Sequence, residues 1–167
     1  MNQIVTYQLQ RAVQSNQTSS LARHAEVAPV VEKIVAALQK VYADKAMKVE
    51  LNLDRQALFA GDERDLLELL GNVLDNAFKY GKSRLCVDVE CVSAKLGDIV
   101  LAIADDGAGI ADDKIEFVLQ RGARADTLAQ GQGIGLAVVT DIVSSYDGKI
   151  AVSRSELGGA LIKISFS

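Results

Sequence analysis

The sequence predicts an α/β sandwich, in which helices are layered on one face of a mixed, mostly antiparallel sheet. Three observations predict this fold: segments with apolar residues at helical intervals, short segments that alternate apolar and polar residues, and glycine-containing turns between the alternating segments. With 167 residues, 49% of them apolar, the chain is long enough to bury a core as one domain.

The composition excludes several classes of protein. The formal net charge of −4 argues against unspecific nucleic-acid binding, which needs clustered basic residues. The longest apolar run, residues 99–104, is far shorter than the roughly 18–20 residues that cross a bilayer, and the N-terminus has no signal segment. Cys86 and Cys91 are placed on opposite faces of a predicted strand, so we expect neither a disulfide nor a metal pair, as in a reducing compartment.

The N-terminal residues differ from the rest of the chain. Residues 1–13 are weakly amphipathic and residues 15–20 are small and polar, which is typical of a linker. We therefore expect an N-terminal helix and linker over residues 1–20, followed by one domain over residues 21–167.

The first half of that domain reads as a helix, two strands and a second helix. A helix is predicted over about residues 27–41 by apolar residues at alternating intervals of four and three: Val27, Val31, Ile34, Leu38 and Val41. Residues 48–53 alternate as a half-buried strand, and residues 57–60 suggest a second, shorter one. Asp62 is placed to cap a long helix over about residues 63–80, which Gly81 ends.

The second half contains two hairpins and a further helix. Residues 84–93 and 99–104 predict a hairpin, and 99–104 is apolar on both faces, which indicates a central strand. A helix follows over about residues 134–145, and residues 149–152 and 160–166 predict a last hairpin. Between the hairpins the chain is rich in glycine, with a short helix expected over about residues 112–119.

The long helix carries a polar face: Glu68, Asn72, Asn76 and Lys79 are spaced so that they line up on one side. One interpretation is a solvated face that happens to carry two asparagines. The other is that the amide oxygens of Asn72 and Asn76 hold a Mg²⁺ that bridges phosphates, with Lys79 adding a positive charge.

Two glycine-rich motifs follow. In Asp-Asp-Gly-Ala-Gly-Ile, residues 105–110, Asp105 ends a buried strand and could accept a hydrogen bond from a ligand amino group, although Asp-Gly turns are common. In Gly-Gln-Gly-Ile-Gly-Leu, residues 131–136, the glycines open a helix, where free N–H groups favour an anion. Residues 121–130 between them could be a flap over a ligand or a surface loop.

The order and spacing of these motifs resemble the catalytic ATP-binding domain of sensor histidine kinases. The motifs are Asn-x-x-x-Asn-x-x-Lys-Tyr on a helix, Asp-x-Gly-x-Gly after a strand, and Gly-x-Gly-x-Gly-Leu opening a helix. The resemblance covers about residues 25–167 and implies the Bergerat fold, which is shared with gyrase, the Hsp90 chaperones and MutL.

The resemblance implies a role for each matching residue. The Mg²⁺ ligands that it implies are Asn72, Asn76 and Gln132. Asp105 would bind the adenine amino group, while Lys79 and Arg124 would face the phosphates as the catalytic cations. The remaining ATP contacts that it implies are Tyr80, Gly107, Gly109, Ile110, Gly133, Gly135 and Leu136. Ala129 stands where related kinases carry an arginine, so one phosphate contact is expected to be missing.

Two further implications concern the reaction. Gyrase-like ATPases have a water-activating glutamate four residues before the magnesium asparagine, and here that place holds Asn72, whose amide cannot act as a base. This favours a kinase over a hydrolase. The alternatives are an ATPase or serine-directed kinase of the same fold, or a nucleotide-binding interaction module without catalysis.

The resemblance also implies partners. The γ-phosphoryl group of ATP would go to a histidine on a dimerisation domain and then to a response regulator. His24 does not precede an acidic residue on a helix, so the acceptor is expected outside this sequence, and residues 1–20 would be the tail of the dimerisation helix. The parent would be a homodimer anchored in a bacterial inner membrane, with this domain in the cytoplasm.

Overall fold

The computed structural model describes residues 24–108 and 133–167. Its elements in chain order are β1 (Ala25–Glu26), α2 (Val27–Val41), η1 (Ala43–Lys45), β2 (Lys48–Leu53), β3 (Leu58–Phe59), α3 (Glu63–Tyr80), β4 (Arg84–Cys91), β5 (Ile99–Asp105), α6 (Gly133–Ser145), β6 (Lys149–Arg154) and β7 (Ala160–Phe166). The segments expected as an N-terminal helix and linker (1–20), a short helix (112–119) and a flap (121–130) lie outside the described residues.

Five strands form one mixed sheet in the order β2-β4-β5-β7-β6. The strand β5 is central, as its apolar residues on both faces predict, and both predicted hairpins are present as antiparallel pairs. The strands β2 and β4 pair in parallel, a pairing that the sequence did not reveal, and α3 supplies the crossover that a parallel pair requires. The short strands β1 and β3 form a separate antiparallel pair.

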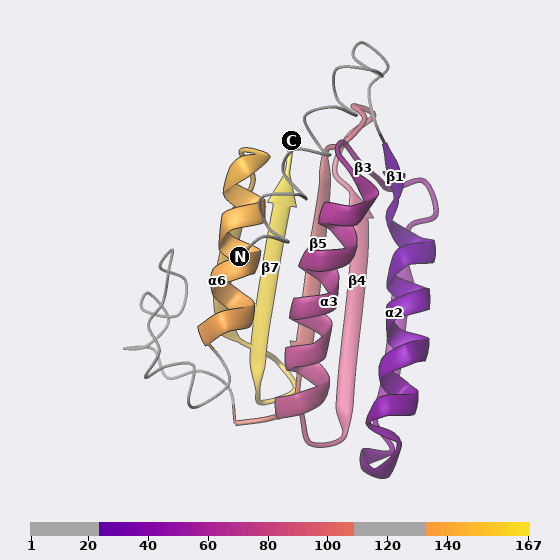
Figure 1. Cartoon of the computed structure of the whole chain (residues 1–167), viewed down its shortest axis with the longest axis vertical. Coiled ribbons are helices and arrows are strands. Elements are labelled where there is room, and N and C mark those ends of the chain that lie inside the picture. The colour runs from indigo at the N-terminus through magenta and orange to yellow at the C-terminus, as the bar shows by residue number, and fades with distance from the viewer. Residues whose placement is uncertain (1–23, 109–132) are drawn as a thin grey trace, which may run out of the picture.

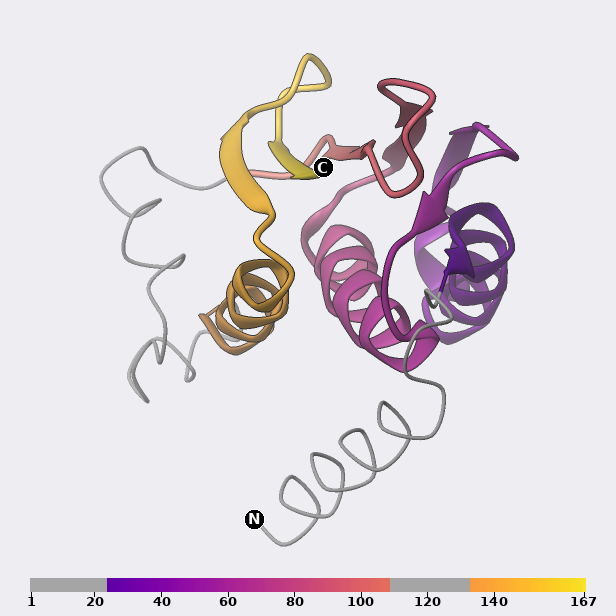
Figure 2. The same cartoon turned by 90° about the horizontal axis from the view of Figure 1, so that it is seen from above.

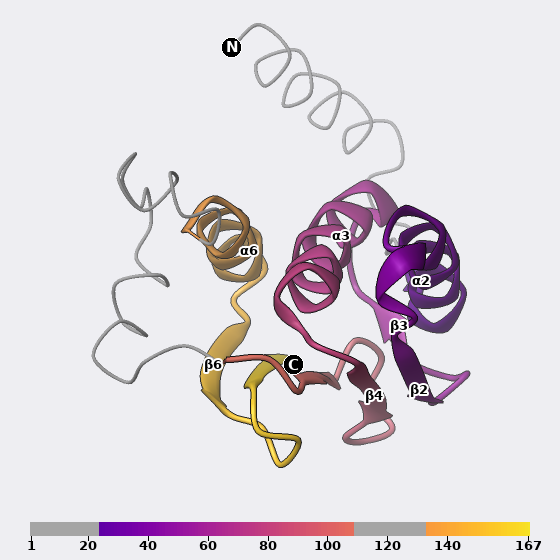
Figure 3. The same ribbon diagram turned by 90° about the horizontal axis from the view of Figure 1, so that it is seen from below.

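The helices cover one face of the sheet. Figure 1 shows α3 between α2 and α6, and the views from above and below in Figures 2 and 3 show all three on the same side of the strands. This layering confirms the predicted α/β sandwich. In Figure 1 the lower end of the molecule is where α3 ends and where β4 and β7 begin.

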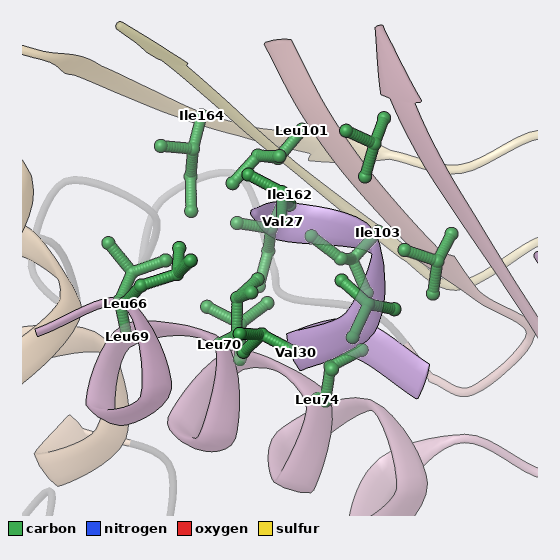
Figure 4. Close-up of a cluster of buried hydrophobic side chains, with 14 of the residues drawn as sticks. Val27, Val30, Leu66, Leu69, Leu70, Leu74, Leu101, Ile103, Ile162 and Ile164 are labelled. Atoms are coloured by element: carbon green, nitrogen blue, oxygen red, sulfur yellow. The ribbon is translucent and has the colours of Figure 1, made fainter. Parts of the chain in front are cut away.

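The core lies between α3 and the sheet. The predicted apolar face of α3 is fully buried and includes Leu66, Leu69 and Leu70. In Figure 4 these side chains point toward sheet residues that include Leu101 and Ile164. Burial of each such side chain stabilises the fold by about 1.5–3 kcal/mol. The prediction was wrong for Val41, the last residue of α2, which is 72% exposed.

Both ends of α3 are fixed as the sequence predicts. The Asp62 side chain accepts a hydrogen bond from the N–H of Arg64 at 2.8 Å and so caps the first turn. Gly81 follows the last turn with a φ of −66°, so it is not needed for a left-handed conformation. A Cβ at Gly81 would lie 2.5 Å from the carbonyl oxygen of Ala77, and this close approach is what requires a glycine.

Candidate nucleotide-binding site

Asp105 is the last residue of β5 and is held from both its side chain and its backbone. Its Oδ1 accepts hydrogen bonds from the N–H groups of Gly107 (2.8 Å) and Ala160 (3.2 Å). Its carbonyl oxygen accepts from Ser155 Oγ (2.6 Å) and from the N–H of Gly159 (3.1 Å). The turn between β6 and β7 therefore fixes the position of this carboxylate.

The second carboxylate oxygen of Asp105 is different. Among the described residues, Oδ2 has no hydrogen-bond partner, although the residue as a whole is only 7% exposed. The described backbone N–H groups that reach this carboxylate all go to Oδ1, so Oδ2 is the oxygen that they leave available to a ligand. Asp105 thus presents one fixed acceptor atom at the rim of the sheet.

Burial raises the pKa of Asp105, although the N–H groups of Gly107 and Ala160 partly offset this. The neighbouring Asp106 behaves in the opposite way. Burial alone would raise its pKa, but hydrogen bonds from the backbone of Ser83 and its neighbours hold the pKa of Asp106 well below its usual range. Asp106 therefore stays ionised and ties the start of β4 to the end of β5.

Glycines allow three chain segments to meet around Asp105. A Cβ at Gly107 would lie 2.1 Å from the carbonyl oxygen of Tyr80, at the end of α3. A Cβ at Gly159 would lie 2.1 Å from Asp105 Oδ1 and 2.5 Å from the nitrogen of Gly107. The sequence predicts Gly107 as a residue that lets a ring approach, and the structure gives it an additional role in packing against α3.

The predicted polar face of α3 leads toward this point. Asn72 and Asn76 are half-buried and Lys79 is exposed. Asn72 Nδ2 donates to the carbonyl oxygen of Glu68 at 2.7 Å, so its amide oxygen is the atom left to act as an acceptor. Asn76 precedes Tyr80 by four residues, a distance of about 6 Å along a helix. Lys79 Nζ lies 5.5 Å from the centroid of the Tyr80 ring, within the range of a cation–π contact.

The donor set on α3 suits a Mg²⁺ bound together with phosphates. In the described residues, no group of three or more His, Cys, Asp or Glu side chains is arranged to hold a metal. The amide oxygens of Asn72 and Asn76 are neutral, hard ligands, and Mg²⁺ usually takes few protein ligands and keeps waters and substrate oxygens. The residues therefore fit a metal that arrives with a polyphosphate.

The structure brings some of the predicted site residues together and leaves others undescribed. Tyr80, Asp105 and Gly107 meet at one end of the sheet. Gly133 and Gly135 lie in the first turn of α6, as expected, and Leu136 is buried in the core. The predicted residues Gly109, Ile110, Arg124 and Gln132 lie outside the described residues. Cys86 and Cys91 are both half-buried free thiols.

The sequence did not single out two residues that hold Asp105. The Gly158-Gly159 pair was interpreted as a turn, but only Gly158 needs glycine for its conformation, with a φ of +105°. The second glycine, which the turn itself does not need, was a signal of close approach. Ser155 gave no signal, because a serine before a turn is common and its contact with Asp105 spans 50 residues.

Comparisons with known proteins agree with this geometry. Residues 61–167 match the model of the family described as histidine kinase-, DNA gyrase B-, and HSP90-like ATPase. The chain is 44% identical over its whole length to the two-component sensor PhoQ of Pseudomonas aeruginosa, covering 36% of that protein. It is 38% identical over 99% of its length to the sensor protein PhoQ of Escherichia coli, covering 34% of that protein. The chain thus spans about a third of the length of these relatives.

Solved structures show the same fold. The mycobacterial sensor histidine kinase MprB superposes with a TM-score of 0.73 at 24% identity, covering 87% of this chain and 97% of that one. The ATP-binding domain of PrrB from Mycobacterium tuberculosis gives a TM-score of 0.70 at 19% identity, covering 88% and 97%. None of the described helices is long and apolar enough to cross a membrane.

The resemblance to sensor histidine kinases is therefore confirmed. Within these proteins, residues 71–80, 121–128 and 131–138 resemble PhoQ in particular, and the identity over the whole chain agrees. The chain belongs to the family of histidine kinase-, DNA gyrase B- and HSP90-like ATPases, and it is similar throughout its length to PhoQ sensor kinases.

Proposed function

We propose that the chain is the Mg²⁺–ATP-binding catalytic domain of a PhoQ-like two-component sensor histidine kinase. It would transfer the γ-phosphoryl group of ATP to a histidine on a separate dimerisation domain, for relay to a response regulator. The observation that carries the proposal is the carboxylate of Asp105, which has one oxygen fixed by two backbone N–H groups and the other without a partner among the described residues.

This arrangement suits adenine. The exocyclic amino group of adenine is a hydrogen-bond donor, whereas guanine has a carbonyl acceptor at the same ring position. An ionised carboxylate oxygen accepts but cannot donate, so Oδ2 of Asp105 would favour adenine and reject guanine. Tyr80, whose carbonyl oxygen packs against Gly107, would line the same pocket.

The polar face of α3 would hold the triphosphate. Asn72 and Asn76 would provide amide oxygens to a Mg²⁺, which when bound would neutralise phosphate charge. The exposed ammonium of Lys79 would add a second positive charge, and its contact with the Tyr80 ring limits where it can lie. We also propose Gln132 as a metal ligand, Arg124 as a second catalytic cation, and nucleotide contacts from Gly109, Ile110, Gly133 and Gly135. Leu136, which the resemblance also implied as an ATP contact, is only 1% exposed and belongs to the core instead.

The residue one turn before Asn76 favours phosphoryl transfer to a histidine over hydrolysis. A hydrolase needs a base to activate water, and Asn72 occupies the place one turn before Asn76. The adjacent Asp75 accepts a hydrogen bond from Tyr42 Oη at 2.8 Å and is engaged there. An imidazole nitrogen attacks with its own lone pair: a P–N bond forms, the bond to the β–γ bridging oxygen breaks, and ADP leaves with that electron pair.

The parent protein would be a homodimer anchored in a bacterial inner membrane, with this domain in the cytoplasm. Its two-component relatives support a response regulator as the downstream acceptor. This domain would meet its substrate histidine on the partner or the same subunit of that dimer.

A labelling experiment tests the proposal. The chain is incubated with γ-labelled ATP, Mg²⁺ and a separately supplied dimerisation domain, and the products are separated. Label on the histidine of the added domain supports the kinase. Release of labelled phosphate without an acceptor would instead indicate an ATPase, and nucleotide binding without either product would indicate an interaction module.

A further inference from the structure

The side chain of Lys45 closes the C-terminal end of α3. Its Nζ donates hydrogen bonds to the carbonyl oxygens of Phe78 (2.7 Å), Lys79 (2.7 Å) and Gly81 (2.8 Å). The last carbonyls of a helix have no partner within the helix, and an ammonium group has three N–H donors. One side chain from a distant segment therefore satisfies three carbonyl groups at the point where α3 ends.

The segment that carries Lys45 is docked on α3 by its own contacts. Tyr42 Oη donates to Asp75 Oδ1 at 2.8 Å, and the Tyr42 ring stacks on Phe78 with centroids 5.9 Å apart. Ala46, which follows η1, has a φ of +50° and donates its N–H to the carbonyl oxygen of Ala43, which closes the turn. The ammonium of Lys45 is thus placed by a rigid turn.

The end of α3 that Lys45 holds is also the wall of the candidate site. Lys79 and Tyr80 are its last two residues. The carbonyl oxygen of Tyr80 packs on Gly107, and a Cβ at Gly81 would come within 3.4 Å of the Asp105 Cβ. A movement of this turn would therefore displace the Tyr80 ring and the Lys79 ammonium relative to Asp105.

The positive charge of Lys45 is a second way in which this residue would favour a nucleotide beside the end of α3. The carbonyl end of a helix carries a partial negative charge, which disfavours an anion nearby. A triphosphate beside Lys79 would approach this end, and the ammonium of Lys45 opposes the partial charge at its source. The three carbonyl bonds occupy all donors of Lys45, so it does not itself bind phosphate.

We propose that Lys45 is a positioning residue of the nucleotide site: it fixes the last turn of α3 so that Tyr80 and Lys79 meet the nucleotide in place. The proposal rests on the proposed function, because it assumes that this chain binds ATP. Lys45 acts through the backbone of α3 and touches no reacting atom.

The test compares four variants of the full chain. Lys45→Met keeps the length of the side chain but removes its donors and charge, Lys45→Gln keeps one donor group, and Lys45→Arg keeps both donors and charge. Lys40→Met makes the same charge change on an exposed residue of α2. The Kd for Mg²⁺–ATP is measured by calorimetry below the unfolding transition of every variant, and amide exchange of Gly81 reports the state of the turn.

We expect Lys45→Met to weaken ATP binding on the order of tenfold and to speed exchange at Gly81. Lys45→Arg keeps the charge and several N–H donors, so it should restore the affinity to within about threefold, and Lys40→Met should match the wild type. If Lys45→Met does not fold, the comparison of Lys45→Gln with Lys45→Arg tests the proposal. The proposal then requires that Lys45→Gln bind Mg²⁺–ATP more weakly than Lys45→Arg.

Two results would overturn the proposal while leaving the proposed function intact. One is that Lys45→Met and Lys40→Met both bind Mg²⁺–ATP with the affinity of the wild type. The other is Lys45→Arg restoring thermal stability without restoring affinity, which would make the role of Lys45 structural only. A wild-type chain that binds no ATP would instead overturn the proposed function, and the role of Lys45 with it.

Discussion

The two ends of the candidate site are built differently. At the purine end, formed by Asp105, Gly107, Ser155, Gly159 and Ala160, hydrogen bonds and close packing fix every group around one carboxylate. At the proposed metal end, formed by Asn72 and Asn76, the side chains are half-buried on the polar face of a helix, and the hydrogen bond of Asn72 goes to Glu68 on the same helix. The proposed purine end is preformed, whereas the proposed metal end would need its ligand to complete it. Changes at the first should therefore cost both stability and binding, and changes at the second only binding.

The largest effect is expected for Gly159→Ala. The new Cβ would lie 2.1 Å from Asp105 Oδ1, so the turn between β6 and β7 must move away from Asp105. We expect a loss of about 3 kcal/mol in the free energy of unfolding, measured by urea denaturation.

The matched control is Gly158→Ala. Its Cβ would meet no atom within 4 Å, and only the φ of +105° opposes it. That strain should cost about 1–2 kcal/mol. Equal losses for the two adjacent glycines would show that the purine end is not closely packed around Asp105.

The next effect concerns the carboxylate of Asp105 itself. In Asp105→Asn, the amide oxygen can still accept from Gly107 and Ala160, but an NH₂ donor replaces the accepting Oδ2. ATP affinity should fall by about 1.5–3 kcal/mol, because a charge-assisted hydrogen bond is lost. Calorimetry with ATP and GTP checks this. Wild-type protein that binds the two nucleotides alike would remove the assigned role of Asp105.

Asn76→Ala tests the proposed metal end, where we expect a change in ATP binding without a change in stability. Alanine is a better helix former than asparagine, so the unfolding free energy should stay within about 0.5 kcal/mol of the wild type. The affinity for ATP in Mg²⁺ should fall about tenfold or more, equal to about 1.4 kcal/mol. With the metal chelated, the variant and the wild type should bind ATP equally. A difference that persists in chelator would argue against a ligand role.

The pH dependence of binding should reflect the purine end. Burial raises the pKa of Asp105, so as pH falls its carboxylate takes up a proton earlier than an exposed aspartate would. The protonated form offers a donor toward the adenine amino group, and ATP affinity should fall by up to about tenfold per pH unit below that pKa. Asp105→Asn has no proton to gain there, so its affinity should lack this step in the same titration.

The smallest expected effect is a gain in stability. Gly71 lies inside α3, next to the metal end, and a Cβ there would meet no described atom within 4 Å. Gly71→Ala should raise the unfolding free energy by about 0.5–1 kcal/mol, because alanine restricts the unfolded chain. Thermal unfolding monitored by circular dichroism checks this. A loss of stability would mean that the metal end is as tightly packed as the purine end.

Several features were predictable because their causes are local. The bounds of α3 follow from the Asp62 cap, the spacing of its leucines and Gly81, all within one stretch of chain. The central place of β5 follows from its run of apolar residues. Asp105 was predictable as an acceptor for the same reason, since it directly follows that run.

The partners of these residues were not predictable, because they come from far along the chain. Ser155 and Ala160 reach Asp105 across 50 and 55 residues, and Lys45 reaches Gly81 across 36. The parallel pairing of β2 with β4 likewise depends on α3 crossing over the sheet.

The sequence by itself determined the long helices and the five strands of the main sheet to within about two residues, and it supplied the side chains of the proposed site, because periodicity, caps and motifs lie in neighbouring residues. Only the tertiary structure decided which oxygen of Asp105 is tied to the backbone and which is left for a ligand. The physical reason is that this choice depends on packing and hydrogen bonds between segments that become neighbours only when the sheet forms.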